Sequence, residues 1–93
     1  MRILLVEDNT DLAASIADYL EMKGHVCDLA DNGKSGLQAT LNNTYDMYVF
    51  DIAMPKMVGL SLCQLLREQY HDDTPVLFLT ARDTLADKQA GFS

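Results

Sequence analysis

Short apolar runs alternate along the chain with segments of helical periodicity, and this alternation limits the folds available to it. Residues 3–6, 47–50 and 76–79 are apolar runs bounded by turn residues. Such runs are too short for helices and are typical of strands covered on both faces. Residues 25–30 are more polar and predict a strand at a sheet edge, whereas we expect the other three strands to be the most central. Strands that alternate with helices predict an α/β fold with a doubly wound parallel sheet.

Helical periodicity predicts four helices, one after each strand. Asn9 or Thr10 is suited to cap the first helix, and Gly24 is a typical residue to end it. The second helix is predicted over residues 34–41, and the third follows a loop at residues 55–59. A fourth helix begins shortly before the sequence stops. The length of 93 residues suits one domain.

An excess of acidic residues argues against several classes of partner. The chain has 14 Asp+Glu against 7 Lys+Arg, a net charge of −7. A surface of this charge does not favour the phosphates of DNA or an anionic membrane. Cys27 and Cys63 lie among apolar residues without the spacing of a metal site, so we expect free thiols in a reducing cytosol. The apolar run at residues 3–6 is too short for a signal peptide or a membrane span, and we predict a cytoplasmic protein.

Side chains with oxygen atoms follow the ends of the three strands that we expect to be central. Glu7 and Asp8 follow the first of these strands. Asp51 and Thr80 follow the other two. An aspartate at such a place is commonly a turn residue or a helix cap, and Asp51 taken alone fits that role as well. The carboxyl ends of parallel strands share one edge of the sheet, however, with neighbours about 4.8 Å apart. We therefore predict that these side chains meet in one cleft.

An acidic pocket made only of oxygen atoms predicts a divalent cation. Like charges at this separation raise one another's pKa unless a cation lies between them, and Mg²⁺ prefers carboxylate ligands. A carboxylate beside Mg²⁺ is suited to phosphoryl transfer, in which it forms an acyl phosphate. Asp51 is the expected nucleophile because it is central and single. Glu7 and Asp8 are expected as metal ligands, and Thr80 as a hydroxyl donor to a phosphoryl oxygen.

Three motifs in these regions resemble the receiver domain of bacterial two-component response regulators. They are Leu4-Leu5-Val6-Glu7-Asp8-Asn9, Phe50-Asp51-Ile52-Ala53-Met54-Pro55-Lys56-Met57-Val58-Gly59 and Phe78-Leu79-Thr80-Ala81-Arg82. The resemblance covers essentially the whole chain, and the motifs occur in the order of the family. The last motif is most similar to the subgroup that carries a winged-helix DNA-binding domain.

The resemblance implies a flavodoxin-like sheet with strand order 2-1-3-4. It implies that Asp51 accepts a phosphoryl group from a histidine kinase. Asp8 and Asp51 would bind Mg²⁺ directly, Glu7 would bind it mostly through water, and the backbone carbonyl of Ala53 would be the third protein ligand. Thr80 would be the switch hydroxyl that turns toward the phosphoryl group. Such a domain promotes its own phosphorylation and dephosphorylation without turnover of an external substrate, so we do not expect an enzyme.

The sequence departs from the family pattern at its end. The family continues with a fifth strand that ends in Lys-Pro and with a fifth helix, whereas this sequence stops within the predicted fourth helix. We therefore expect residues 1–93 to be a receiver domain without its fifth strand and fifth helix, and without the catalytic lysine. The uncovered edge along residues 76–79 predicts marginal stability or pairing with another chain.

The resemblance also implies partners. They are a sensor histidine kinase, a second copy of the chain in a homodimer, and a DNA-binding output domain in the same full-length protein, which would regulate transcription. The domain itself is not expected to bind nucleic acid or a membrane.

Three other classes of protein share part of this pattern. Haloacid dehalogenase-like phosphatases also use an aspartate nucleophile with Mg²⁺, but they need a second aspartate two positions later, where this chain has Ala53. A flavin- or nucleotide-binding module needs a phosphate loop rich in Ser, Thr and Gly after the first strand, where Glu7 and Asp8 would repel a phosphate. A degenerate receiver would bind a partner without phosphorylation, but Asp51 and Thr80 are both present.

Overall fold

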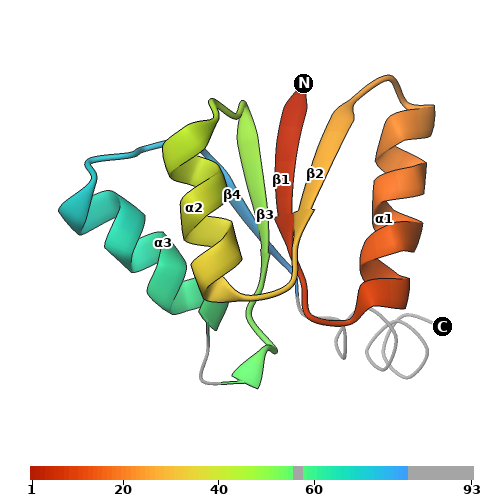
Figure 1. The fold of residues 1–93 in the computed structure, drawn as a ribbon. Helices are drawn as coiled ribbons and strands as arrows, with labels where there is room; N and C mark the ends of the chain where they lie inside the picture. The colour runs from red at the N-terminus through yellow and green to blue at the C-terminus, as the bar shows by residue number, and fades with distance from the viewer. Residues whose placement is uncertain (56–57, 80–93) are drawn as a thin grey trace, which may run out of the picture.

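A parallel sheet of four strands lies between helices in the computed structural model, which describes residues 1–55 and 58–79. The strand order is β2-β1-β3-β4 (Figure 1). The strands are β1 (Arg2–Val6), β2 (Val26–Ala30), β3 (Met47–Asp51) and β4 (Val76–Leu79), and the helices are α1 (Thr10–Met22), α2 (Gly33–Asn42) and α3 (Val58–Gln69). The predicted doubly wound α/β fold, its strand order and the edge position of β2 are therefore confirmed.

Alternate side chains of the central strands point to opposite faces of the sheet and build two cores. Leu4 and Val6 of β1 pack with Phe50 on the face that α2 and α3 cover. Ile3 and Leu5 pack on the opposite face, which α1 covers (Figure 1). These four residues of β1 are fully buried, as expected for a strand with helices on both sides.

The strand at residues 76–79 lies at an edge of the sheet, as the predicted strand order requires. In the described part of the chain β4 pairs only with β3 and lies at the edge of the sheet. Leu77 and Phe78 are 53% and 39% exposed. The predicted uncovered edge along residues 76–79 is therefore confirmed for the described residues. The central position that the apolar composition of this strand favoured is not found there, because burial of an apolar strand depends on a neighbour and not on composition.

Two of the helices, α1 and α2, begin at side chains suited to cap them. The Asn9 side chain accepts a hydrogen bond from the Leu12 N–H at 3.1 Å, and the Asn32 side chain accepts one from the Ser35 N–H at 2.8 Å. Each bond satisfies one of the free N–H groups in the first turn of a helix. Gly24, with a φ of 91°, follows the end of α1. Asn9 is therefore the cap of α1, one of the two residues that the sequence predicted.

An aromatic row runs along β3 and anchors the loop before β4. The rings of Tyr48 and Phe50 are stacked, with centroids 5.3 Å apart, and Tyr45 meets Tyr48 edge to face at 5.9 Å. The Tyr48 hydroxyl donates to the carboxylate of Asp72, which also accepts from the N–H and the hydroxyl of Thr74. Burial and the Asp72 carboxylate raise the pKa of Tyr48 to about 12. The amino-terminal end of β3, at the opposite end of the strand from Asp51, is therefore held firmly.

Candidate metal and phosphoacceptor site

The carboxyl ends of β1 and β3 lie side by side. Val6 of β1 is in register with Phe50 of β3, so the next residues, Glu7 and Asp51, stand at the same level. Glu7 is fixed to β2 as well, because its N–H donates to the Ala30 carbonyl at 2.9 Å. The sheet register therefore brings together two carboxylates that are 44 positions apart in the sequence.

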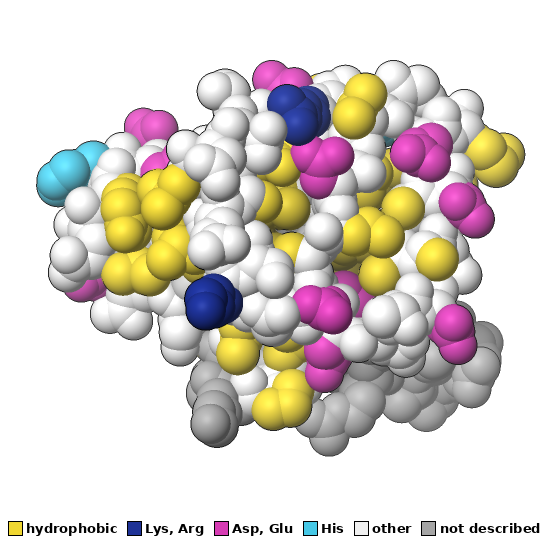
Figure 2. Space-filling model, in the orientation of Figure 1, with side chains coloured by type: hydrophobic (Ala, Val, Ile, Leu, Met, Phe, Trp, Pro, Cys, Tyr) yellow, Lys and Arg dark blue, Asp and Glu magenta, His cyan; other side chains and the backbone are white. Residues whose placement is uncertain are grey.

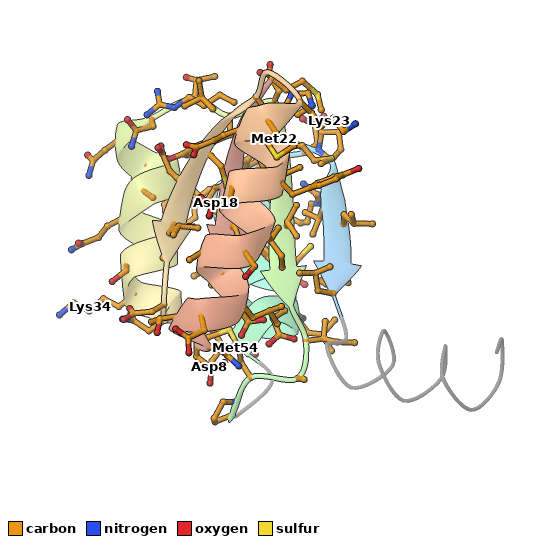
Figure 3. The ribbon with its side chains drawn as sticks, turned by 90° about the vertical axis from the view of Figure 1, so that its right-hand side faces the viewer. Asp8, Asp18, Met22, Lys23, Lys34 and Met54 are labelled. Carbon is orange, nitrogen blue, oxygen red and sulfur yellow. The ribbon has the colours of Figure 1, made fainter. Side chains whose placement is uncertain are left out.

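Three carboxylates converge at this edge. Glu7, Asp8 and Asp51 each offer one oxygen, and these oxygens lie within 4.8 Å of one another. Glu7 and Asp51 are 2% and 3% exposed, whereas Asp8 is exposed. Met54 lies in the loop that follows β3, and Figure 3 shows Asp8 at the same end of the molecule as Met54. The predicted meeting of the three carboxylates in space is confirmed.

Backbone N–H groups orient the two buried carboxylates. The N–H of Asn9 donates to Glu7 Oε2 at 2.8 Å, and the N–H of Ala53 donates to Asp51 Oδ1 at 2.8 Å. In both cases the donor lies two residues after the carboxylate, as in the common turns formed by acidic side chains. Asp51 therefore has both roles: its side chain accepts a hydrogen bond within a turn, and it also belongs to the acidic cluster.

The environment of Glu7 is unfavourable for its negative charge. The pKa of Glu7 is raised to about 7, first of all by burial and then by Asp8 and Asp51, while the hydrogen bond from the Asn9 N–H lowers it. Glu7 Oε1 is buried and has no hydrogen-bond partner among the described residues. A buried carboxylate oxygen without a partner is costly. The cluster therefore fits a hydrated divalent cation that binds oxygen ligands, because such a cation and its bound water would supply the missing partner and offset the repulsion.

A small cleft opens beside the cluster, between the first turns of α1 and α2. Its volume is about 320 Å³, and Glu7 lines it together with the polar side chains of Thr10, Asp31 and Ser35. Sequence reasoning did not propose these last three residues for the site and named Thr10 only as a possible helix cap. Each lies close after a strand end or at the start of a helix, and that position is the signal that could have identified them.

The structure places the other predicted site residues only in part. Ala53 is exposed in the loop after Asp51. Met54, which the sequence reasoning left aside, is 5% exposed and belongs to the core that α2 and α3 cover, so it fastens this loop to the core. Thr80 lies outside the described residues, as do Lys56 and the predicted fourth helix.

A family model and known proteins match this chain. The model of the response regulator receiver domain matches residues 3–93. The transcriptional regulatory protein RprY of Bacteroides fragilis is 40% identical over 92 residues, which are 99% of this chain and 39% of that protein. The transcriptional regulatory protein DltR of Streptococcus agalactiae is 42% identical over 91 residues, 98% of this chain and 40% of that protein. The chain thus spans about 40% of the length of these relatives.

Solved structures agree with the family match. The receiver domain of the Francisella response regulator 1452 superposes with a TM-score of 0.79 and 34% identity, over 98% of this chain and 74% of that one. The response regulator TrrA of Thermotoga maritima, in complex with Mg²⁺ and BeF, gives a TM-score of 0.78 and 30% identity, over 97% and 81%. TrrA in complex with the histidine kinase ThkA superposes with a TM-score of 0.76 and 31% identity, over 86% of this chain and 68% of that one.

The fold and the acidic cluster together define a class: a flavodoxin-like α/β domain with a cluster of carboxylates at the carboxyl ends of its strands. Within this class, the chain belongs to the family of response regulator receiver domains. The receiver domain is a signalling switch of two-component systems, and the relatives named above are transcriptional regulators. Among the described residues, no helix has the length and apolar composition needed to cross a membrane.

Proposed function

We propose that this domain is switched by phosphorylation of Asp51, with the phosphoryl group coming from a histidine kinase. The observation that carries the proposal is the convergence of Glu7, Asp8 and Asp51 from two strand ends, with Asp51 almost fully buried. The complex of the similar protein TrrA with the kinase ThkA supports a kinase as the donor.

Asp51 acts as the nucleophile in this proposal. Its Oδ1 is held by the Ala53 N–H, so we assign the attack to Oδ2. The bond between Oδ2 and phosphorus forms as the bond between phosphorus and the kinase imidazole nitrogen breaks, and the imidazole takes the electron pair. The product is an acyl phosphate at the end of β3. A domain of this kind modifies itself once and has no turnover of an external substrate.

Glu7, Asp8 and Asp51 would hold Mg²⁺, together with the backbone carbonyl of Ala53. Mg²⁺ would neutralise the phosphoryl oxygens during transfer. Asp8 and Asp51 bind directly in this proposal, and buried Glu7 binds mostly through water. The buried, unpartnered oxygen of Glu7 supports a cation at this place.

The output of the switch belongs to the full-length protein. The relatives RprY and DltR are named as transcriptional regulatory proteins, and we propose a DNA-binding output domain and a cytoplasmic location. The hydroxyl of Thr80 would bind the added phosphoryl group, which carries roughly −1.5 to −2 charges at neutral pH. Its movement would shift the following segment between two states, and homodimerisation is a further proposed consequence.

The test is phosphorylation by a small acyl phosphate donor, with and without Mg²⁺, mapped by mass spectrometry. We expect one phosphoryl group on Asp51, none in Asp51→Asn or in the presence of EDTA, and a higher Mg²⁺ requirement in Asp8→Asn. Asp18→Asn is the matched control, because Asp18 is an exposed aspartate on α1 away from the cluster (Figure 3). The same measurements apply to the full-length protein. Modification elsewhere, or modification that does not depend on Mg²⁺, would contradict the proposal.

A further inference from the structure

A glycine of α3 touches the backbone of the residue that we propose as the phosphoacceptor. Gly59, the second residue of α3, is buried. A Cβ atom at Gly59 would lie 2.5 Å from the backbone oxygen of Asp51, 3.0 Å from its carbonyl carbon and 3.3 Å from Cβ of Phe50. Cβ atoms essentially never approach another atom as closely as 2.5 Å. Any other residue at this position would therefore have to move either α3 or the Asp51 peptide.

The contact differs in kind from that of another buried helical glycine, Gly36. A Cβ atom at Gly36 of α2 would meet Cδ2 of Leu62 at 3.0 Å and Cγ2 of Val6 at 3.1 Å. Those atoms are the ends of side chains, which adjust by small rotations. The Asp51 peptide has no such freedom, because the next residue, Ile52, donates its N–H to the Leu79 carbonyl of β4 at 2.9 Å.

We propose that Gly59 is a positioning residue for the phosphoacceptor. By its lack of a side chain it lets the first turn of α3 rest directly on the Asp51 peptide, and this contact fixes where the Asp51 carboxylate stands relative to Glu7 and Asp8. The three carboxylates share a cation site only if their oxygens stay close together, and here these oxygens lie within 4.8 Å of one another. The inference rests on the proposed function, because it assumes that this cluster binds Mg²⁺.

A glycine that only served packing would affect stability and nothing else, so the test must separate stability from placement. Urea denaturation at increasing Mg²⁺ concentrations gives both quantities for each variant: the free energy of unfolding without metal, and the Mg²⁺ affinity from its increase with Mg²⁺. The proteins compared are the original chain, Gly59→Ala, Asp51→Asn, the double variant and Gly36→Ala. Gly36→Ala is the matched control, since it also adds a methyl group to a buried helical glycine.

We expect Gly59→Ala to weaken Mg²⁺ binding about tenfold or more, the range seen when groups that orient metal ligands are removed. Gly36→Ala should leave the affinity within about twofold of the original value. In the Asp51→Asn background the same Gly59→Ala change should also stay within about twofold, because its effect passes through Asp51. The inference would be overturned if Gly59→Ala lost no more Mg²⁺ affinity than Gly36→Ala, or if its loss of affinity persisted in the Asp51→Asn background.

Two further outcomes keep the test decisive. If Gly59→Ala is unfolded in buffer, the series is repeated in trimethylamine N-oxide, which favours compact states. A variant that stays unfolded there overturns the inference, because Gly59 would then serve folding and not the placement of Asp51. If the original chain itself does not bind Mg²⁺, the proposed function fails first, and that result is distinct from a normal Mg²⁺ site that is insensitive to Gly59.

Discussion

Glu7 departs further than any other described acidic residue from the exposed position that carboxylates prefer. It is 2% exposed, one of its oxygens has no partner among the described residues, and its pKa is raised to about 7, first of all by burial. Carboxylates are rarely buried in this way without a partner. The metal-free domain is therefore strained electrostatically at the place where we propose that it binds Mg²⁺.

This burial gives a pH dependence whose sign follows from linkage. The ordinary pKa of Glu7 is 4.5 and its folded pKa is about 7, so between these pH values the folded chain binds more protons than the unfolded chain. The contribution of Glu7 to the free energy of unfolding therefore falls as pH rises from about 5 to about 7. Without divalent cations, Glu7→Gln should remove this fall and stabilise the domain above pH 7 by roughly 1–3 kcal/mol.

Urea denaturation in EDTA at pH 5 and pH 7.5 measures this effect. Glu21→Gln is the control, because Glu21 is exposed on α1 and its replacement should leave the pH profile unchanged. With Mg²⁺ present, the original chain should regain stability at pH 7.5 and Glu7→Gln should regain less. Equal pH profiles for the original chain and Glu7→Gln would rule out a strained Glu7.

At the scale of elements, α1 and the acidic cluster are joined through one residue. The side chain of Asn9 caps α1 by accepting from the Leu12 N–H, and its own N–H donates to the Glu7 carboxylate. The beginning of α1 and the orientation of Glu7 are therefore linked by a single short turn.

Removal of this cap tests the link. Asn9→Ala should cost about 0.5–2 kcal/mol, the usual loss for a helix cap, and should also weaken Mg²⁺ binding, because the turn that orients Glu7 is loosened. Asn32→Ala removes the equivalent cap of α2 and should cost a similar amount with little effect on Mg²⁺. Both quantities come from urea denaturation with and without Mg²⁺. Equal effects of the two variants on Mg²⁺ affinity would show that the cap of α1 has no special connection to the site.

The elements show which structural features sequence alone could predict. Apolar runs gave β1, β3 and β4 within a residue or two, since a strand between two layers of helices has to be apolar on both faces. The strand order came from the resemblance to the receiver family, because periodicity does not determine which strands are neighbours. Helical periodicity also leaves burial undecided: Leu37 and Leu41 lie one helical turn apart on α2, yet Leu37 packs on the core and Leu41 is 53% exposed.

Sequence alone could predict which carboxylates form the candidate site, but not how deeply they are buried. A carboxylate after a strand is expected at the carboxyl edge, so Glu7 and Asp51 could be named. The burial of Glu7 could not, because it depends on the distant β2, to which its N–H donates. The placement of Thr80 stays a prediction, since it lies outside the described residues.

At the scale of the whole molecule, charge and apolar exposure act in opposite directions. Figure 2 shows acidic side chains distributed over one face with few basic ones between them, consistent with a net charge of −7. This charge opposes association of copies at low ionic strength. The apolar side chains of Leu77 and Phe78, on a strand that pairs on one side only in the described part of the chain, favour association.

We predict that residues 1–93 associate with one another in a concentration-dependent manner, and more strongly at higher salt, which screens the acidic surface. Leu77→Lys places a charge on the edge strand and should shift the equilibrium toward the monomer. Sedimentation velocity at several protein concentrations measures the equilibrium between monomer and associated chains. Leu41→Lys is the control, because Leu41 is equally exposed but lies on α2. A chain that is monomeric at every concentration and salt level and unfolds cooperatively would contradict the prediction.

The aromatic row of β3 gives the domain a built-in optical reporter. The chain has no tryptophan, and Tyr48 stacks on Phe50, the neighbour of Asp51. Near-ultraviolet circular dichroism arises from aromatic rings held in fixed asymmetric surroundings, so this signal should come largely from this row, whose three rings are buried. Cation binding or phosphorylation at Asp51 can therefore be followed in the unlabelled protein, in real time and without a dye.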